Sequence, residues 1–374
     1  MLGKQRHSRL AFVGILNFQG AFILRRHSLM IGLALFAAAM SLRSLAAEPQ
    51  GLPKTLRLFG RWDRRRPDRA VTVNSGSYIL AHFTGSELTA LFDVSINKPG
   101  VPTLAWRLDD GPWQEAEVAD RVPLADHLAT GPHTLMLMAR GLDEHQNRWT
   151  QPLVASITFL GLKLAPEGKL LRPLPQWDRP KLKIEFLGDS ITEGVLVQSP
   201  REGKTTWAWQ TDARQSYAAQ TAMRLNAAWR QVGFGATGLA HGGSGGAPGA
   251  LESFNFFYKD CPRDDWQPDL VVVNQGTNDS GMAPDQYRPL YAKYLDLIRA
   301  AYPKAKIAAV RPFVGAQAQA IHAEVEARRA AGDTRVYYID TEGWYSGPLH
   351  PAAEGSIPLA EKLAAALQAQ VLKR

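Results

Sequence analysis

Cysteine is almost absent from this sequence, and the absence excludes two kinds of stabilising chemistry. The chain of 374 residues contains one cysteine, Cys261. No disulfide can therefore form within the chain, and no cysteine cluster can bind a metal ion. We interpret Cys261 as a small, partly buried side chain rather than as a catalytic thiol.

Long apolar runs are also missing near the amino terminus. The uncharged run at residues 29–40 has about a dozen residues, short of the ~20 that a stable membrane span needs. It follows Arg25 and Arg26 and precedes small residues that end at Ala46 and Ala47, which is the order found in a signal peptide. The sequence therefore predicts a leader over residues 1–47, cleavage after Ala46 or Ala47, and a secreted or periplasmic protein without stable membrane insertion. An uncleaved anchor is the alternative.

Acidic residues are absent from this predicted leader, and that absence explains the basic character of the chain. The formal net charge is +8, and residues 1–47 contribute six lysines and arginines, so the remainder carries +2. A small excess of this kind is weak support for a nucleic-acid partner, and we expect none. Apolar residues make up 45% of the chain and charged residues 21%, which is typical of a globular protein with a substantial core.

Helical periodicity is missing from residues 48–165, which instead show the alternation of half-buried strands. Apolar and polar residues alternate along 88–96, residues 77–84 and 133–140 look similar, and Asp110-Gly111 is a hairpin signal. Many short strands separated by turns favour an all-β sandwich, in the form of a jelly roll. Four prolines then mark residues 166–180 as a linker, because proline stiffens the chain and lacks an N–H.

Residues 181–374 alternate between strand and helix patterns, which predicts a parallel sheet covered by helices on both faces. The run at residues 270–274 is continuously apolar, as in a strand buried on both faces. Ligands of such sheets bind at the carboxyl ends of the strands. The predicted strands are 182–187, 270–274, 307–310 and 336–339, and the predicted helices are 216–229, 285–301, 316–330 and 356–372.

Four short segments with chemical potential fall after strands or before the last helix of this region. They are Gly188-Asp189-Ser190, the glycine-rich residues 233–238, Gly276-Thr277-Asn278-Asp279, and His350-Pro351. Each segment alone is a weak indication of function, since a lone segment of this kind is often a turn, a cap or a loop. The glycine-rich stretch lacks the lysine of a P-loop and a clean GxGxxG pattern, which argues against a phosphate cradle.

Taken together, the order and spacing of the four segments resemble the SGNH (GDSL-type) hydrolase superfamily. The resemblance implies a flavodoxin-like three-layer α/β/α domain with a parallel sheet over residues 181–374. It also implies that Ser190 is the nucleophile, that His350 is its base, and that the Ser190 N–H, Gly238 and Asn278 form the oxyanion hole, with Gly235 as the alternative glycine. Elementary chemistry agrees, because a serine needs a nearby imidazole to accept its proton.

One position departs from the pattern of that superfamily. Three residues before the histidine, where the superfamily usually has an aspartate that orients the imidazole, this chain has Gly347. Three substitutes are open: a backbone carbonyl near Gly347, Asp340, or Glu342. We favour a Ser-His dyad with a carbonyl as the orienting group, since a carbonyl can accept from the imidazole N–H and fix its tautomer.

The amino-terminal half adds a narrower resemblance. Residues 60–63 (Gly-Arg-Trp-Asp) and 76–79 (Gly-Ser-Tyr-Ile), ahead of the Ser190 motif, are similar to carbohydrate esterase family two. That resemblance implies hydrolysis of O-acetyl esters on polysaccharides or oligosaccharides of the acetylxylan or acetylglucomannan type, with no cofactor or metal. Trp344 is a candidate platform for the sugar. The alternatives are a lipase or thioesterase, a peptidoglycan O-acetylesterase, and a non-catalytic glycan-binding protein.

Overall fold

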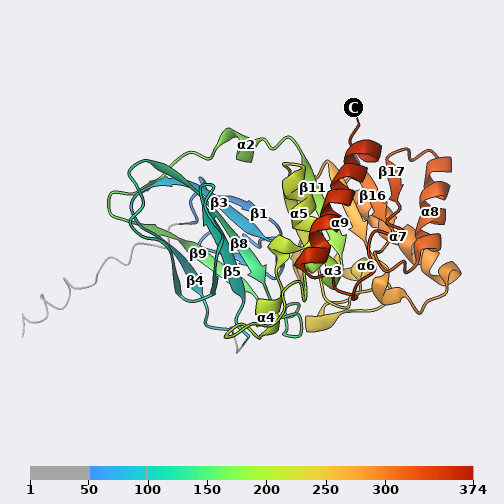
Figure 1. The fold of residues 1–374 in the computed structure, drawn as a ribbon, viewed down its shortest axis with the longest axis horizontal. Helices are drawn as coiled ribbons and strands as arrows, with labels where there is room; N and C mark the ends of the chain where they lie inside the picture. The colour runs from blue at the N-terminus through green and yellow to red at the C-terminus, as the bar shows by residue number, and fades with distance from the viewer. Residues whose placement is uncertain (1–50, 98–99, 374) are drawn as a thin grey trace, which may run out of the picture. The chain divides into compact units, whose positions relative to one another are not determined.

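The computed structural model describes residues 51–97 and 100–373, and these form one compact unit (Figure 1). The predicted leader, residues 1–47, lies outside the described residues. Among the helices that the structure describes, none combines the length and the apolar character needed to cross a membrane.

The first part of the described chain is built from two antiparallel sheets whose apolar faces enclose one core. Alternating burial along β4 (Leu88–Asp93), with Leu88, Ala90 and Phe92 inside, gives the period of two predicted for this strand. The all-β architecture predicted for this region is confirmed. One sheet has the order β1 (Arg57–Phe59), β3 (Tyr78–Thr84), β8 (Pro132–Gly141), β5 (Thr103–Leu108), β6 (Gln114–Glu117), and the other has the order β2 (Ala70–Thr72), β9 (Ile157–Leu164), β4, β7 (Arg121–Ala125).

The segment predicted as a linker is partly structured. Within residues 166–180, β10 (Lys169–Leu170) pairs with β3 at the edge of the first sheet. A short helix, α2 (Pro175–Asp178), follows and begins at a proline, which suits the first turn of a helix because that turn needs no N–H donor there.

The second part is a five-stranded parallel sheet between two layers of helices (Figure 1). One apolar cluster packs α5 and α9 against one face of the sheet, and another packs α7 and α8 against the other face. The predicted three-layer α/β/α fold is therefore confirmed. The strand order is β12 (Ala228–Gly233), β11 (Lys183–Gly188), β15 (Leu270–Asn274), β16 (Lys306–Val310), β17 (Val336–Ile339), and the helices are α5 (Tyr217–Arg224), α7 (Pro284–Ala301), α8 (Ala318–Ala330) and α9 (Ala353–Ala366).

The predicted helix over residues 216–229 is wrong in its last part. Helix α5 ends at Arg224, and Asn226 has a left-handed backbone conformation with φ of 49° that breaks the helix. The chain then enters β12, every residue of which is buried beside β11. Parallel pairing in the middle of the molecule overrides the local helical pattern, since buried backbone groups need partners that the sheet supplies.

The register of the parallel strands brings the chemically interesting segments to one edge of the sheet. Gly188 at the end of β11 pairs with Gly233 of β12 on one side and with Asn274 of β15 on the other. The three segments that follow these strands therefore start at the same level. This is the edge at which open α/β sheets bind ligands.

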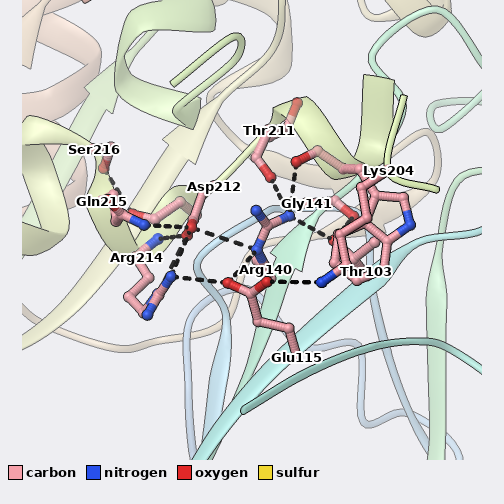
Figure 2. A network of polar contacts seen from close by, with 12 residues as sticks. Thr103, Glu115, Arg140, Gly141, Lys204, Thr211, Asp212, Arg214, Gln215 and Ser216 are labelled. Carbon is pink, nitrogen blue, oxygen red and sulfur yellow. Dashed lines mark hydrogen bonds and ion pairs between the residues drawn. The ribbon is translucent and has the colours of Figure 1, made fainter. Parts of the chain in front are cut away.

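A buried arginine ties the β-sandwich to the chain segment that precedes α5 (Figure 2). Arg140 on β8 donates through Nη1 to the carbonyl oxygens of Trp209 and Thr211, both at 3.0 Å. Its Nε lies 3.3 Å from Glu115 and 3.4 Å from Asp212, two carboxylates that come from different parts of the chain. The guanidinium thus neutralises two largely buried acids at the junction of the two sheet systems.

We expect the variant Arg140→Ala to lower the free energy of unfolding by about 3–5 kcal/mol, because it leaves buried carboxylates without their partner. The matched control is Arg201→Ala, since Arg201 also pairs with Glu115, at 2.8 Å, but its side chain is 48% exposed. An exposed ion pair is worth about 0–1 kcal/mol. Urea titrations of the two variants check the prediction, and equal midpoints would contradict it.

Candidate active site

Ser190 stands in a tight turn between a strand and a helix. Strand β11 ends at Gly188, and Ser190 begins the one-turn helix α3 (Ser190–Glu193). The Asp189 side chain caps this helix by accepting from the Ile191 N–H at 3.0 Å, and Gly194 closes it with a left-handed φ of 87°. The serine side chain is held at the carboxyl edge of the sheet, with the residue 6% exposed.

His350 lies against this serine. Its Nε2 is 2.9 Å from the Ser190 Oγ, although the two residues are 160 positions apart. Burial lowers the pKa of His350 below its ordinary value, and the negative charge of Glu193 partly opposes this shift. The imidazole is therefore neutral near pH 7 and can accept the serine proton, which is the chemistry of an activated nucleophile.

The groups proposed to orient His350 lie elsewhere. Asp340 and Glu342 each lie 3.7 Å from the guanidinium of Arg311, in ion pairs at the surface. Gly347 packs under the ring of Tyr345. Within residues 51–97 and 100–373, no hydrogen bond joins the Nδ1 of His350 to any group. The hypotheses that Asp340, Glu342 or a carbonyl at Gly347 fixes the imidazole find no contact in this structure.

Gly238 and Gly235, the two glycines considered for the oxyanion hole, both lie on the loop that follows β12. The Gly238 N–H donates to the carbonyl of His241 at 3.2 Å, so this donor is already used within its own loop. Gly235, the alternative, stands two residues beyond the end of β12, just as Ser190 stands two residues beyond the end of β11. Because Gly188 and Gly233 are paired, Gly235 and Ser190 occupy equivalent positions at the sheet edge. Gly238 lies next to the Asn278 turn, since a Cβ atom there would fall against the Oδ1 of Asp279, whereas Gly235 lies against Glu144 of the β-sandwich. The donor in the oxyanion hole stays a prediction.

Asn278 is directed toward the nucleophile turn. It lies in the 3-10 turn Thr277–Asp279 that follows β15. Its Nδ2 donates to Asp189 at 3.3 Å and to the Thr237 carbonyl at 3.1 Å. To stabilise an oxyanion at Ser190, the Asn278 amide has to give up one of these hydrogen bonds and donate to the carbonyl oxygen of the substrate instead. Burial raises the pKa of Asp189 to about 7. Its hydrogen bond from Asn278 is therefore weak near neutral pH, where the carboxyl is partly protonated.

A shallow hollow of about 560 Å³ opens beside this centre. Asn278 and Leu349, the neighbour of His350, both line it, as does Val314. Leu349 is 49% exposed and Val314 is 45% exposed, which is unusual for large apolar residues. The predicted sugar platform Trp344 is not among the lining residues; it packs against the apolar cluster beneath α9. No motif or periodicity singles out Val314, which is an isolated valine in a loop.

A buried ion pair supports the nucleophile helix from the β-sandwich. Glu193, three residues after Ser190, accepts two hydrogen bonds from Arg148 at 2.5 and 2.8 Å. The hydroxyl of Ser75 donates to the same carboxylate at 3.2 Å. Sequence reasoning missed this pair, because Arg148 and Ser75 belong to the β-sandwich and carry no motif. In the described chain, no group of three or more histidine, cysteine, aspartate or glutamate residues is placed to hold a metal ion.

The site and the fold define a class of enzyme. A serine at a strand-to-helix turn, paired with a histidine from the last loop and flanked by a glycine and an asparagine, is the arrangement of an acyl-transferring hydrolase. Residues 186–357 match the model of the GDSL-like Lipase/Acylhydrolase family. This match includes Ser190, Asn278 and His350, so the chain contains a domain that is similar to that family.

The particular relatives of the chain narrow this class. It is 28% identical over 332 residues to Cellulase/esterase CelE of Acetivibrio thermocellus; the match covers 83% of this chain but spans only 39% of that relative. It is 27% identical to Acetylxylan esterase / glucomannan deacetylase of Cellvibrio japonicus, over 72% of this chain and 73% of the relative. A family two carbohydrate esterase from Clostridium thermocellum, solved in complex with cellohexaose, matches with a TM-score of 0.70 and 25% identity, over 84% of this chain and 98% of its own.

The pKa of His350 predicts the acid side of the pH profile. A general base works only when it is deprotonated, so kcat/KM should rise with pH. Because burial lowers the pKa of His350, we expect the midpoint of this rise below pH 6.5. Initial rates on a simple ester from pH 4 to 8 measure it. The rise must persist in His241→Gln, whose histidine lies near Asn278, and its loss there would assign the titration to His241.

Asn278→Ala should lower kcat by about 10²–10³, or about 2.7–4 kcal/mol of barrier, because it removes one donor to the oxyanion. KM should change little, since the contact forms in the transition state. The comparison variant is Asn274→Ala, because Asn274 is a buried asparagine at the end of β15, the strand that leads into the Asn278 turn. A selective rise in KM for Asn278→Ala, with kcat unchanged, would mean that the side chain binds substrate instead.

Proposed function

We propose that this protein is an exported O-acetyl esterase of carbohydrates, with Ser190 as nucleophile and His350 as base. One observation carries the proposal: the Ser190 Oγ and the His350 Nε2 lie 2.9 Å apart at the carboxyl edge of the sheet. The predicted leader over residues 1–47 supports export, and the names of the relatives support a carbohydrate substrate of the acetylxylan or glucomannan type.

The first half of the reaction forms an acyl-enzyme. The Ser190 Oγ attacks the carbon of the ester carbonyl while His350 takes the proton of the hydroxyl. The carbonyl oxygen becomes negatively charged. The backbone N–H groups of Ser190 and of Gly238, with Gly235 as the alternative, and the amide of Asn278 stabilise that charge. His350 then returns its proton to the sugar oxygen, the bond between carbonyl carbon and sugar oxygen breaks, and the deacetylated sugar leaves.

The second half repeats these steps with water. The oxygen of a water molecule attacks the acetyl-serine while His350 takes one of the water protons. His350 returns this proton to the Ser190 Oγ when acetate leaves. A dyad can perform both steps, because the essential acid and base is a single imidazole. Glu193 contributes a favourable field, since its negative charge raises the pKa of His350 against the effect of burial.

The surroundings of the centre favour a short acyl group on a polar carrier. The hollow beside Asn278 is lined by polar residues, Thr277 and Ser280 among them, as well as by Val314, Ala316 and Leu349. Mixed lining of this kind suits a saccharide, which presents both C–H faces and hydroxyl groups. A long acyl chain would instead need a continuous apolar trench.

The first experiment compares the protein from residue 48 onward with its Ser190→Ala variant on 4-nitrophenyl acetate and 4-nitrophenyl octanoate. We expect hydrolysis of the acetyl ester, a clear preference over octanoate, and a loss of about 10³-fold or more in the variant, because the nucleophile is removed. Release of acetate from acetylated glucomannan and acetylxylan is then measured with the same pair.

Each other outcome has a distinct meaning. A preference for octanoate would favour a lipase, and acetate release from peptidoglycan alone would favour a cell-wall esterase. Equal, negligible rates in both proteins, together with retention on an insoluble glycan, would turn the proposal into glycan binding without catalysis.

A further inference from the structure

A groove lies at the opposite end of strand β12 from the catalytic centre. Its volume is about 770 Å³, and neither Ser190 nor His350 lines it. Ala228 and Trp229, at the start of β12, form part of its wall, whereas Gly233 marks the catalytic edge at the end of that strand. At about 3.3 Å per residue, the strand separates the two places by roughly 16 Å. The groove is therefore distinct from the catalytic centre.

The base of this groove is the outer face of the first sheet of the β-sandwich. Leu80 of β3 pairs with Met136 of β8, and Met136 pairs with Arg107 of β5, so these three side chains share one face of the sheet. Residues that alternate with them, such as Ile79 and Leu137, belong to the core of the sandwich. Leu80 and Met136 are only partly buried, so the base offers apolar surface to a ligand.

One wall of the groove comes from the short helix α2, in the segment between the two sheet systems. Trp177 of α2 lines the groove and is partly exposed. The helix is fixed beside the β-sandwich because Asp178 binds the guanidinium of Arg57 on β1, and the Trp177 N–H donates to the Leu174 carbonyl at 2.9 Å. The groove therefore has an aromatic side chain on a helix that is held in place.

Polar groups of both signs surround the same groove. Arg107 and Lys181 are cations and Asp109 and Asp110 are anions, so the formal charges of the lining residues cancel. In the part of the chain that the structure describes, no hydrogen bond or ion pair engages the side chains of Arg107, Asp110 or Lys181; the Arg107 guanidinium lies over the ring of Trp113 at 5.3 Å. These donors and acceptors are available to a ligand.

We propose that this groove, called the α2 groove from here on, is a second saccharide-binding site that holds a neutral segment of the glycan substrate away from the catalytic centre. The choice of a glycan rests on the proposed function. Sugar rings present C–H faces that pack on an aromatic ring such as Trp177, and hydroxyl groups that bond to charged side chains such as Arg107 and Asp110.

The size and the charge of the α2 groove both favour this ligand. Its volume of about 770 Å³ falls within the range of roughly 300–1,000 Å³ that is typical of ligand sites, which often lie between domains. A nucleic acid or another polyanion needs a surplus of cations, and here the charges cancel. A neutral chain with many hydroxyl groups needs hydrogen-bonding groups of both kinds, which this lining supplies.

The test is a calorimetric titration of the wild-type protein with mannohexaose and with xylohexaose, which carry no acetyl ester and are not turned over. We expect saturable binding of at least one of the two, and affinity about tenfold lower in Trp177→Ala, because the aromatic contact is lost. Asp110→Ala, which changes the side of the groove that belongs to the β-sandwich, should weaken binding several-fold by removing an acceptor for hydroxyl groups.

Two further variants locate the binding. Trp266→Ala also removes a partly exposed tryptophan, but Trp266 does not line the α2 groove, so this variant should bind like the wild type. Leu349→Ala changes the hollow beside Asn278 instead. Binding that survives in Leu349→Ala and is weakened in Trp177→Ala belongs to the α2 groove. Thermal unfolding checks that the four variants fold like the wild type.

Three results overturn the inference. The first is a wild-type protein that binds neither oligosaccharide at millimolar concentration, and this result needs no variant to fold. The second is wild-type affinity in both Trp177→Ala and Asp110→Ala, with binding lost in Leu349→Ala, which would place the sugar in the catalytic hollow alone. The third is a dimer in sedimentation that Trp177→Ala dissolves, which would make a second copy of the chain the occupant of the groove.

The binding test does not depend on catalysis, so the α2 groove and the proposed function fail separately. Acetate release that survives in Ser190→Ala overturns the proposed nucleophile, whatever the oligosaccharides do. Esterase activity that depends on Ser190, in a protein whose oligosaccharide binding ignores Trp177, leaves the function standing and removes only the second site.

Discussion

The bond on which the catalytic centre depends is the buried pair of Arg148 and Glu193. Glu193 belongs to the short helix that presents Ser190, and burying its carboxylate without a partner would cost several kcal/mol. The cation that satisfies it comes from the β-sandwich and makes two hydrogen bonds. The nucleophile turn therefore keeps its shape only when the β-sandwich is packed against it, and the two sheet systems form one unit for a chemical reason.

Charged residues at the same junction interact electrostatically with the active site. The charge of Glu193 raises the pKa of His350, and Arg148 binds Glu193. Glu144, on the same loop as Arg148, interacts electrostatically with Arg148 and with Glu193. Arg140 repeats the arrangement further away, with Glu115 and Asp212 (Figure 2). Arginine suits this work because it stays charged and donates in several directions at once. The β-sandwich thus supplies the cation that neutralises Glu193 on the helix of Ser190.

Position 347 carries no carboxylate, and the acids proposed to take its place do not contact His350. The acids proposed as substitutes, Asp340 and Glu342, are held by Arg311 at the surface. What acts on the imidazole is a charge at a distance, from a residue three positions after the nucleophile. A field of this kind stabilises the imidazolium less than a directly bonded aspartate, but it leaves the imidazole neutral at rest and ready to accept a proton.

The sequence by itself determined the order of most elements and singled out Ser190, Asn278 and His350 as candidates for the reaction. Alternation in residues 88–93, the apolar run at 270–274 and the motif around Ser190 are local patterns, and in the first two segments the structure confirms the predicted strands. Tertiary structure alone decided the rest: that residues 228–233 form a strand rather than the end of a helix, and that Arg148 of the β-sandwich binds Glu193 on the helix of Ser190. Each of these depends on strand register or on contacts between distant segments, and such contacts leave no periodic trace in the chain.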